Sequence, residues 1–333
     1  MKLSIVIICW NDWKVLRDCL RSIFQSTGSP NSALDFEVIV SDNGSEDGSV
    51  ELIHEKFPLV KVIENGANLG FAKGNNAGIR VSRGDLVLIL NPDTVVHEGT
   101  LQKWVAFADR HPEAGAFGCR IVNPDSSYQE SARPFPTVWR DTIAALYLRG
   151  LGRLSNVFLS DRYAGWNGDS ERSVDWQSGC CVMFRADLLQ RLGGFDEQFF
   201  YHFEEVDLCR RVWNAGHSIL FTPDPVVTHL GGQSVSRFPL RFELEKCRNR
   251  YRYFYKHFGK AGARRSRLTL LLWLRMRLAG YGLRARFRPS DAAQNRLAAY
   301  RILIAWNGTI DPVRFVENGE EPAADAVAAV QIP

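Results

Sequence analysis

The fold of this chain is decided by one stretch, Asp85-Leu86-Val87-Leu88-Ile89-Leu90-Asn91-Pro92-Asp93-Thr94. Its five consecutive apolar residues leave no polar face, which is typical of a central strand covered on both sides. Because Pro92 has no backbone N–H, the strand should end at Asn91. Asp93 is then expected at the carboxyl end of the strand, the edge of an open α/β sheet where ligands bind. A carboxylate there can hold a hard cation that carries a diphosphate, although Asn-Pro-Asp by itself also fits a plain turn.

The chain before this stretch alternates between strand and helix patterns. β-branched residues predict strands at 3–9, 36–40 and 60–63, and apolar residues at helical spacing predict a helix over 15–23. The polar loop at 41–49 can cap the helix that follows it. Strand–helix alternation with short connections predicts a parallel, doubly wound sheet.

The chain after this stretch is less regular. We expect a helix over 101–108, a strand at 116–122, and a long variable loop region over a binding face at 123–175. A strand at 179–184 and a helix at 186–192 follow, and another helix opens at 203–211. The last expected pieces of this part are a strand at 218–222 and a loop at 228–234.

Length and composition indicate a globular protein with one large or two small domains. The chain has 333 residues and a formal net charge of +4. Its seven cysteines form no Cys-x-x-Cys pair, which favours reduced, buried thiols in a cytosolic protein over a disulfide framework or a zinc site. The apolar run 3–9 is too short for a signal peptide core, and no apolar stretch reaches the length of a membrane span.

Several short motifs follow one another in a recognisable order. They are Ser4-Ile5-Val6-Ile7, Val40-Ser41-Asp42-Asn43-Gly44-Ser45, Asn68-Leu69-Gly70-Phe71-Ala72 with Gly74-Asn75-Asn76, Leu90-Asn91-Pro92-Asp93, Ser178-Gly179, Gly193-Gly194-Phe195-Asp196, Phe203-Glu204-Glu205-Val206-Asp207-Leu208 and His229. In this order they resemble glycosyltransferase family 2, inverting enzymes with the GT-A fold. Within that family the chain is similar to bacterial rhamnosyltransferases that act on polyprenyl-diphosphate-linked sugars.

The resemblance covers about residues 1–257 and implies an α/β fold. The expected architecture is the GT-A, or nucleotide-diphospho-sugar transferase, fold: a doubly wound mixed sheet with C-terminal amphipathic helices. Residues 1–100 would form the nucleotide-sugar-binding half of this domain, and 101–258 its acceptor-binding and catalytic half. A basic helical extension at 259–315 and a mobile tail at 316–333 would complete the chain.

Two departures from the family pattern matter. The usual Asp-x-Asp is Asn91-Pro92-Asp93 here, which leaves one carboxylate and resembles the rhamnosyltransferase branch. Glu204-Glu205 stands where relatives commonly have Glu-Asp, so the second carboxylate reaches one methylene further.

The resemblance implies a metal site and a catalytic base. Asp93 and His229 would hold the Mg²⁺ or Mn²⁺ that bridges the diphosphate of the donor, and a histidine ligand slightly favours Mn²⁺. On position alone, His229 is equally well a loop histidine bonded to backbone. Glu205 is the expected general base and Glu204 would orient the acceptor or the base, although acids at a helix start are also ordinary. Asp207 is the third expected catalytic residue. It could also pair with Arg210, three residues further on, and so rigidify the helix.

The resemblance also assigns the donor and acceptor subsites. Asp42 would accept a hydrogen bond from a pyrimidine base, although capping a helix is an alternative role. The remaining residues expected to bind the donor are Asn43, Asn68, Gly70, Phe71, Gly74, Asn75 and Asn91. Those expected to line the acceptor site are Asp175, Trp176 and Gly179, with Trp176 either stacking on a sugar or packing in the core.

The segment 260–290 has nine Lys or Arg residues and no acid, with Leu271, Leu272, Trp273 and Leu274 among them. One-signed charge interleaved with apolar residues predicts amphipathic helices on an anionic membrane surface. The alternatives are helices packed on the catalytic domain or a homodimer interface. Nucleic-acid binding is not expected, because no aromatic or Gly-rich RNA motif accompanies the charge.

Three functions remain open from the sequence. The first is a rhamnosyltransferase that uses dTDP-L-rhamnose and a lipid-linked saccharide acceptor for lipopolysaccharide O-antigen or another bacterial surface glycan. It would be a cytoplasmic protein, peripheral on the inner membrane. The second is a family member with a UDP-hexose donor, and the third is a non-catalytic carbohydrate-binding protein on this fold.

Overall fold

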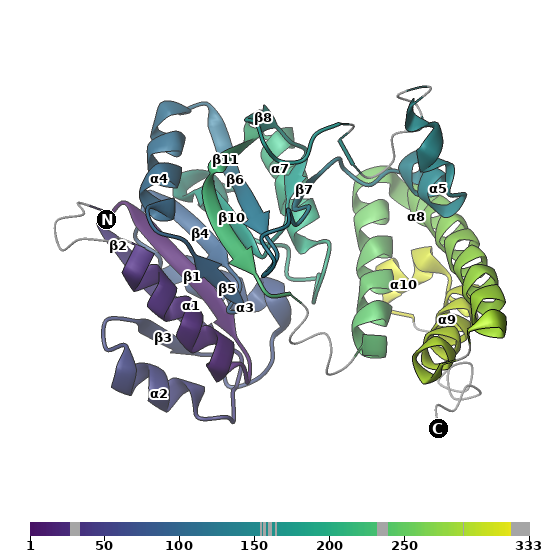
Figure 1. Cartoon of the computed structure of the whole chain (residues 1–333), viewed down its shortest axis with the longest axis horizontal. Coiled ribbons are helices and arrows are strands. Elements are labelled where there is room, and N and C mark those ends of the chain that lie inside the picture. The colour runs from purple at the N-terminus through teal and green to yellow at the C-terminus, as the bar shows by residue number, and fades with distance from the viewer. Residues whose placement is uncertain are drawn as a thin grey trace. The chain divides into compact units, whose positions relative to one another are not determined.

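A computed structural model describes residues 1–26, 34–153, 155, 158, 162–163, 165–231, 239–288 and 290–320. The chain divides into two compact units. The first, here called the sheet unit, comprises Met1–Phe135 and Gly165–Arg237. The second, the helical unit, comprises Pro136–Ala164 and Phe238–Pro333, and Figure 1 shows the elements of both.

A mixed sheet forms the centre of the sheet unit. Its strands, as far as the structure describes them, follow the order β3-β2-β1-β4-β10-β6-β11-β5, with β8 beside β11. The strands are β1 (Leu3–Cys9), β2 (Phe36–Asp42), β3 (Lys61–Glu64), β4 (Leu86–Leu90), β5 (Thr94–Val96), β6 (Ala114–Val122), β8 (Arg172–Ser173), β10 (Cys181–Arg185) and β11 (Ser218–His229). A separate ribbon pairs β7 (Ala132–Arg133) with β9 (Trp176–Gln177).

The N-terminal half of the sheet is parallel, as predicted from the alternation of strands and helices. β1 lies between β2 and β4 and runs parallel to both, while β10 is antiparallel to β4 and to β6. All five residues of β4 are buried, which suits a strand covered on both faces. The strand ends at Leu90, one residue before the expected end, and Asn91 donates its backbone N–H to the carbonyl of Cys180 at 2.9 Å.

Helices cover the two faces of the sheet (Figure 1). The helices of this unit are α1 (Trp13–Ser26), α2 (Ser49–Lys56), α3 (Gly70–Val81), α4 (Thr100–Arg110), α6 (Ala186–Arg191) and α7 (Glu204–Asn214). Apolar residues of α1, α2 and α4 join alternate residues of the strands in one large buried cluster. The polar loop does cap α2, although not from the N-cap residue: Gly48 occupies that position, and Oδ1 of Asp47 accepts from the backbone N–H of Ser49 at 3.2 Å.

The last strand of the sheet is longer than the sequence predicts. β11 continues through Pro223 and Pro225 to His229, and the pairing with β6 shifts between Thr222 and Val226. Prolines are tolerated where a bulge interrupts the ladder, so they do not end the strand. His229 therefore ends a strand beside Thr94 of β5 instead of lying in a loop, and residues 232–234 of the expected loop lie outside the described residues.

The region 123–175 is not the single long loop that the sequence predicts. It contains β7, α5 (Val138–Ala145), the 3-10 helix η1 (Leu148–Arg153) and β8. Residues 136–164 belong to the helical unit, so the chain leaves the sheet unit and later returns to it.

The helical unit consists of α5 and η1 with three later helices, α8 (Pro239–Phe287), α9 (Asp291–Thr309) and α10 (Pro312–Asn318). α8 begins well before residue 259, and Gly259 lies inside it at a kink with φ 66° and ψ −169°. Residues 316–318 of the expected tail are helical, and 321–333 fall outside the described part of the chain. Within the described residues, no helix is long and apolar enough to cross a membrane.

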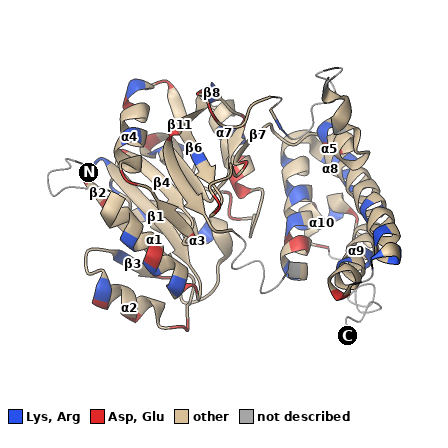
Figure 2. Ribbon diagram, in the orientation of Figure 1, with Lys and Arg blue, Asp and Glu red and all other residues tan. Residues whose placement is uncertain are grey.

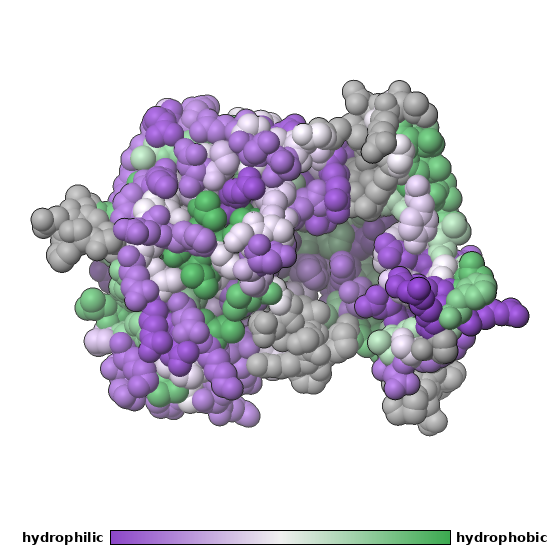
Figure 3. Space-filling model, in the orientation of Figure 1, coloured by the Kyte–Doolittle hydropathy of each residue, from purple (hydrophilic) through white to green (hydrophobic). Residues whose placement is uncertain are grey.

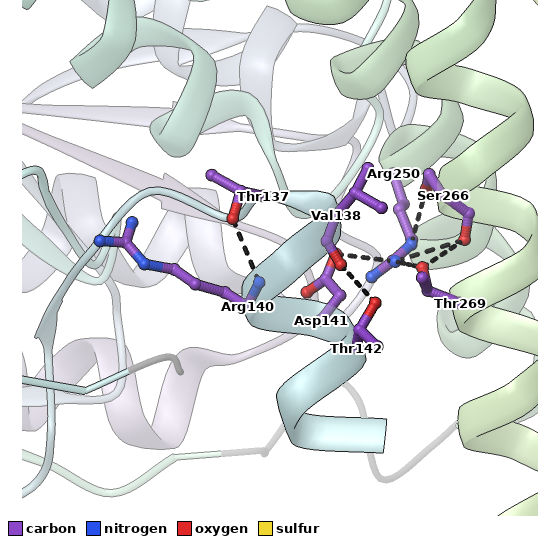
Figure 4. A network of polar contacts seen from close by, with 8 residues as sticks. All are labelled: Thr137, Val138, Arg140, Asp141, Thr142, Arg250, Ser266 and Thr269. Carbon is purple, nitrogen blue, oxygen red and sulfur yellow. Dashed lines mark hydrogen bonds and ion pairs between the residues drawn. The ribbon is translucent and has the colours of Figure 1, made fainter. Parts of the chain in front are cut away.

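A partly buried polar network fastens α5 to α8 (Figure 4). The guanidinium of Arg250 pairs with Asp141 of α5 at 2.8 Å. The same group donates to the hydroxyls of Ser266 and Thr269, each at 2.9 Å, in the part of α8 beyond the kink. Because Arg250 has several acceptors at once, it holds α5 and both parts of α8 together.

Candidate active site

Asp93 and His229 meet at the edge where β4 and β11 end and β5 begins. The Nε2 atom of His229 lies 3.2 Å from Oδ1 of Asp93, and the side chains are 14% and 9% exposed. The backbone N–H of Leu230 donates to the carbonyl of Asp93 at 2.9 Å, which fixes the two chain segments to each other. The sequence predicted this pair, and the strand pairing explains why residues so far apart in the chain come together.

Opposing effects act on the imidazole of His229. Burial lowers the pKa of His229, but hydrogen bonds to Asp93 and Cys180 outweigh burial and raise it to about 10. The other ring nitrogen, Nδ1, lies 2.7 Å from Oε1 of Gln129, a residue that the sequence did not single out.

The pair has the spacing of two neighbouring ligands of one cation. Two octahedral ligands at right angles, each about 2.1 Å from Mg²⁺, lie about 3 Å apart, close to the 3.2 Å between Asp93 Oδ1 and His229 Nε2. Among the described residues no group of three or more His, Cys, Asp or Glu side chains could hold a metal ion. A cation held by Asp93 and His229 would therefore complete its shell with phosphate or water oxygens, as Mg²⁺ does in many phosphate-binding sites.

Two buried glutamates open α7. Glu204 and Glu205 are 3% and 9% exposed, and they follow His202 and Phe203, which have positive φ angles of 66° and 73°. Consecutive left-handed residues other than glycine are strained, a feature that clusters at functional sites. Burial, and then the charge of Glu205, raises the pKa of Glu204 well above its ordinary value.

The contacts of Asp207 indicate a structural role. It is fully buried and pairs with Arg211 at 2.8 Å, where the sequence suggested Arg210. Arg211 also donates to the carbonyls of Leu192 and Gly194, while Arg210 lies over the ring of Phe135. The Asp207–Arg211 pair thus ties α7 to the turn after α6.

Two residues draw the glutamates and the Asp93–His229 pair into one site. Burial and then the charges of Glu204, Glu205 and Asp93 raise the pKa of Tyr201, so the three carboxyl groups are close enough to act electrostatically on one phenol. A Cβ atom on Gly179 would lie 3.3 Å from Cβ of Glu205 and 3.4 Å from the ring of Phe71. Gly179 is therefore a close-contact point between α3 and α7, and Tyr201 is a site residue that sequence reasoning missed.

The residues expected to bind the donor form a polar cluster beside β2 and α3. Asp42 Oδ2 accepts from the backbone N–H groups of Gly44 and Ser45, whereas its buried Oδ1 has no hydrogen-bond partner in the described part of the chain. Asn43 donates to the carbonyl of Gly70 at 3.1 Å, and Asn68 accepts from the N–H of Gly70 at 3.0 Å.

The start of α3 is fixed from two sides. Asn75 donates to the carbonyl of Phe71 at 2.9 Å. Gly70 has a φ of +80°, and a Cβ there would come within 2.6 Å of Phe200. A Cβ on Gly74 would lie 2.9 Å from Asn43 Oδ1. These donor residues therefore bind mainly to one another and shape the floor, and two of their buried oxygens, Asp42 Oδ1 and Asn75 Oδ1, have no hydrogen-bond partner among the described residues.

The residues expected at the acceptor site are held by backbone contacts. Asp175 Oδ2 accepts from the N–H of Phe135 at 2.7 Å, and Trp176 Nε1 donates to the carbonyl of Pro134 at 3.0 Å. Both contacts fasten the segment before β10 to the segment after β7. Of the three expected residues, the contacts place Gly179 alone against Glu205.

Comparisons with known proteins point to one family. Residues 4–193 match the family model described as Glycosyl transferase family 2. Over 254 residues the chain is 31% identical to N-acetylglucosaminyl-diphospho-decaprenol L-rhamnosyltransferase of Mycobacterium tuberculosis, covering 71% of this chain and 78% of that protein. Rhamnosyltransferase WbbL of Escherichia coli is 26% identical over 196 residues, 56% of this chain and 70% of that protein.

A solved structure shares the fold. The mannosyltransferase PcManGT from Pyrobaculum calidifontis, in complex with GDP-Man and Mn²⁺, aligns with a TM-score of 0.55 at 19% identity. The alignment covers 96% of this chain and 88% of that chain. It supports the α/β GT-A architecture with C-terminal helices.

Proposed function

The chain belongs to glycosyl transferase family 2, and on this premise we propose that it transfers L-rhamnose from dTDP-L-rhamnose to a hydroxyl of a polyprenyl-diphosphate-linked saccharide. Membership makes the chain a glycosyltransferase and removes the non-catalytic carbohydrate-binding protein from the alternatives. The choice of rhamnose and of a lipid-linked acceptor is supported by the names of two relatives, the mycobacterial L-rhamnosyltransferase and WbbL. The product would enter a bacterial surface polysaccharide such as an O-antigen.

One observation carries the proposal: Asp93 pairs with His229 at 3.2 Å at the sheet edge, and the buried glutamates that open α7 meet the start of α3 across Gly179. This arrangement suits an inverting displacement, which needs one base for the acceptor and neutralisation of the negative charge on the leaving diphosphate. The acceptor oxygen bonds to the anomeric carbon as the bond from that carbon to the diphosphate breaks. The acceptor proton passes to Glu205.

The two glutamates take different roles in this proposal. Glu204 is the more deeply buried and keeps its proton, since two adjacent buried carboxyl groups do not both ionise readily. Glu205 then carries the negative charge that a base needs. Asp207 acts through Arg211 and positions α7 without touching the reacting atoms.

Asp93 and His229 would hold Mg²⁺ or Mn²⁺ and Asn91 would border that site. The cation, when bound, stabilises the charge that develops on the leaving diphosphate. Its presence in PcManGT supports a divalent metal without choosing between the two ions. On the nucleotide side, the partnerless Asp42 Oδ1 would accept the N–H of a pyrimidine base.

We also propose that the protein acts at the cytoplasmic face of the inner membrane through one face of α8. The basic-apolar face consists of Arg264, Arg265, Leu268, Arg275, Met276, Leu283, Arg286 and Phe287, all of them exposed. At about 100° per residue these positions fall within one half of the helix circumference. Lys and Arg follow α8 in Figure 2, and hydrophobic side chains reach the surface of the helical unit in Figure 3.

The membrane-facing residues differ from those the sequence suggested. Leu271 and Leu274 are 7% and 1% exposed, and Leu274 belongs to the apolar core of the helical unit. Trp273 packs against that core, where Cys247 and Tyr251 also lie. A protein that ends near Gly259 would lack Leu271, Trp273 and Leu274, and the core residues Cys247 and Tyr251 would lose the side chains that pack on them. Truncation would therefore disturb folding and is a poor test of membrane binding.

Substitution on the intact chain tests membrane binding instead. We expect Arg264→Gln, Arg265→Gln and Arg275→Gln together to weaken binding to anionic vesicles roughly a hundredfold at low salt, at about 1 kcal/mol for each arginine. Three changes at exposed positions elsewhere, Arg21→Gln, Arg301→Gln and Arg314→Gln, serve as the matched control. Equal losses in both triple variants would show that this face is not the contact.

A donor panel tests the reaction. The purified protein with a polyprenyl-diphosphate-linked N-acetylglucosamine acceptor should release nucleotide from dTDP-L-rhamnose at least tenfold faster than from UDP-hexoses or GDP-mannose. Faster release from a UDP-hexose would replace the rhamnose proposal with the second candidate. Asp42→Asn should weaken binding of every pyrimidine donor alike.

A further inference from the structure

The imidazole of His229 is held by a chain of side chains that starts at the surface. These hydrogen-bonded side chains lie in the turn after β6. In this turn Ser126 has a φ of 65°, and the backbone N–H of Gln129 donates to the carbonyl of Ile121 at 2.9 Å. The members of the chain are Asp125, Ser127, Asn123 and Gln129, in that order. No member is a predicted site residue.

The direction of every hydrogen bond in this chain follows from its first member. The Asp125 carboxylate can only accept, and its pKa is lowered by the hydrogen bonds that Ser127 donates, the hydroxyl at 2.6 Å and the backbone N–H at 3.0 Å. With its proton committed to Asp125, the Ser127 oxygen accepts from Nδ2 of Asn123 at 2.9 Å.

The amide orientations follow in the same way. Asn123 presents Oδ1 to Nε2 of Gln129, which donates to it at 2.8 Å. Gln129 must then present Oε1 to the imidazole, and this oxygen lies 2.7 Å from His229 Nδ1. Since an amide oxygen only accepts, Nδ1 of His229 must carry a proton.

We infer that Gln129, oriented by the Asp125–Ser127–Asn123 chain, is a positioning residue that keeps the ring proton of His229 on Nδ1 and so makes Nε2 the nitrogen offered to a cation. The inference rests on the metal site of the proposed function. With the Nδ1 proton held in the hydrogen bond to Gln129, Nε2 is the ring nitrogen that would bind a cation. The same bond sets the plane of the ring, which aims Nε2 at Asp93, 3.2 Å away.

Gln129 can hold the imidazole in place because its own side chain and backbone are fixed by hydrogen bonds. It is half-buried, its backbone is bound to β6, and both ends of its amide are engaged. A side chain held at three points has little freedom to release the imidazole. Partners of metal-binding histidines typically change metal affinity by 10–100-fold when they are removed.

The test measures Mn²⁺ affinity of the full-length protein with saturating dTDP, by electron paramagnetic resonance of free Mn²⁺. Gln129→Met keeps the length of the side chain and removes the acceptor, and we expect Mn²⁺ to bind about tenfold more weakly. Gln129→Glu restores an acceptor for Nδ1–H and should bind Mn²⁺ within about threefold of the unchanged protein. Gln190→Met, the same change at an exposed glutamine of α6, is the matched control and should leave affinity unchanged.

A double-mutant cycle separates this inference from the metal site itself. In a His229→Ala background, Gln129→Met should cause no further loss of Mn²⁺ affinity, because its only route to the cation is gone. Unchanged affinity in folded Gln129→Met, with weaker binding in His229→Ala, would overturn the positioning role alone. Unchanged affinity in His229→Ala would overturn the metal site of the proposed function and this inference with it.

Discussion

The two glutamates at the start of α7 should respond very differently to the same substitution. Glu205→Gln keeps the shape of the side chain and removes the proton acceptor, so turnover should fall by about 10²–10⁴-fold, the range that a general base contributes. Glu204→Gln replaces a carboxyl group whose pKa is already raised by burial and by Glu205. Glutamine resembles the neutral acid, so turnover should fall by no more than about fivefold.

The raised pKa of Glu204 gives a second, independent readout in stability. Its folded-state pKa lies above the unfolded value, so between the two pKa values the folded protein binds a proton that the unfolded chain has lost. The free energy of unfolding therefore falls as pH rises above about 4.5, by up to about 1.4 kcal/mol per pH unit. Glu204→Gln has no proton to lose there, so its stability should not show this fall.

Nucleotide release at saturating donor and acceptor measures turnover, and calorimetric titration with dTDP checks that both variants still bind nucleotide. Urea unfolding between pH 5 and pH 8 gives the stability slopes, which should differ between the unchanged protein and Glu204→Gln. A crippled Glu204→Gln beside a nearly normal Glu205→Gln would refute the assignment of the base. Identical slopes would refute the protonated state of Glu204.

Three further outcomes follow from the structure. Excess chelator should reduce transfer at least about a hundredfold and Mg²⁺ or Mn²⁺ should restore it; full turnover in chelator would contradict a metal at Asp93 and His229. Asp141→Asn and Arg250→Met should each destabilise the protein by about 1.5–3 kcal/mol and together by clearly less than the sum, because both changes remove the same charged hydrogen bond. Additive losses in urea unfolding would mean that the network of Figure 4 is not coupled. Gly70→Ala should lower the free energy of unfolding by at least about 2 kcal/mol, and by more than Gly193→Ala does. Both glycines have a positive φ, but only at Gly70 would the new Cβ lie 2.6 Å from Phe200. Equal melting temperatures of the two variants would show that this contact relaxes freely.

Much of the sheet unit could be predicted because its signals are local. The uninterrupted apolar run of β4 and the β-branched run of β1 report burial on both faces, and the structure gives both strands in the parallel order expected. Asp93 could be placed because a strand end is a local feature. The role of His229 could be predicted only from the order of the motifs along the chain, because its partner Asp93 lies far away in the sequence.

The misses share a physical cause, which is dependence on distant contacts. Gln129 has no local mark of function, and its partner His229 is 100 residues away. The prolines of β11 suggest an end to the strand, yet the neighbouring β6 carries the pairing past them with a shift. α5 has only eight residues, too few for a clear helical period, and its burial is provided by α8.

The insertion of α5 in the middle of the sheet unit has a consequence for synthesis on the ribosome. Asp141 is made 109 residues before Arg250, the side chain that pairs with it. At about 5–20 residues per second, α5 is without its partner for roughly 5–20 s. A ribosome-bound chain stopped near residue 235 should therefore be cut by protease within α5 while its finished N-terminal strands resist, and release of the full chain should protect α5 from cleavage.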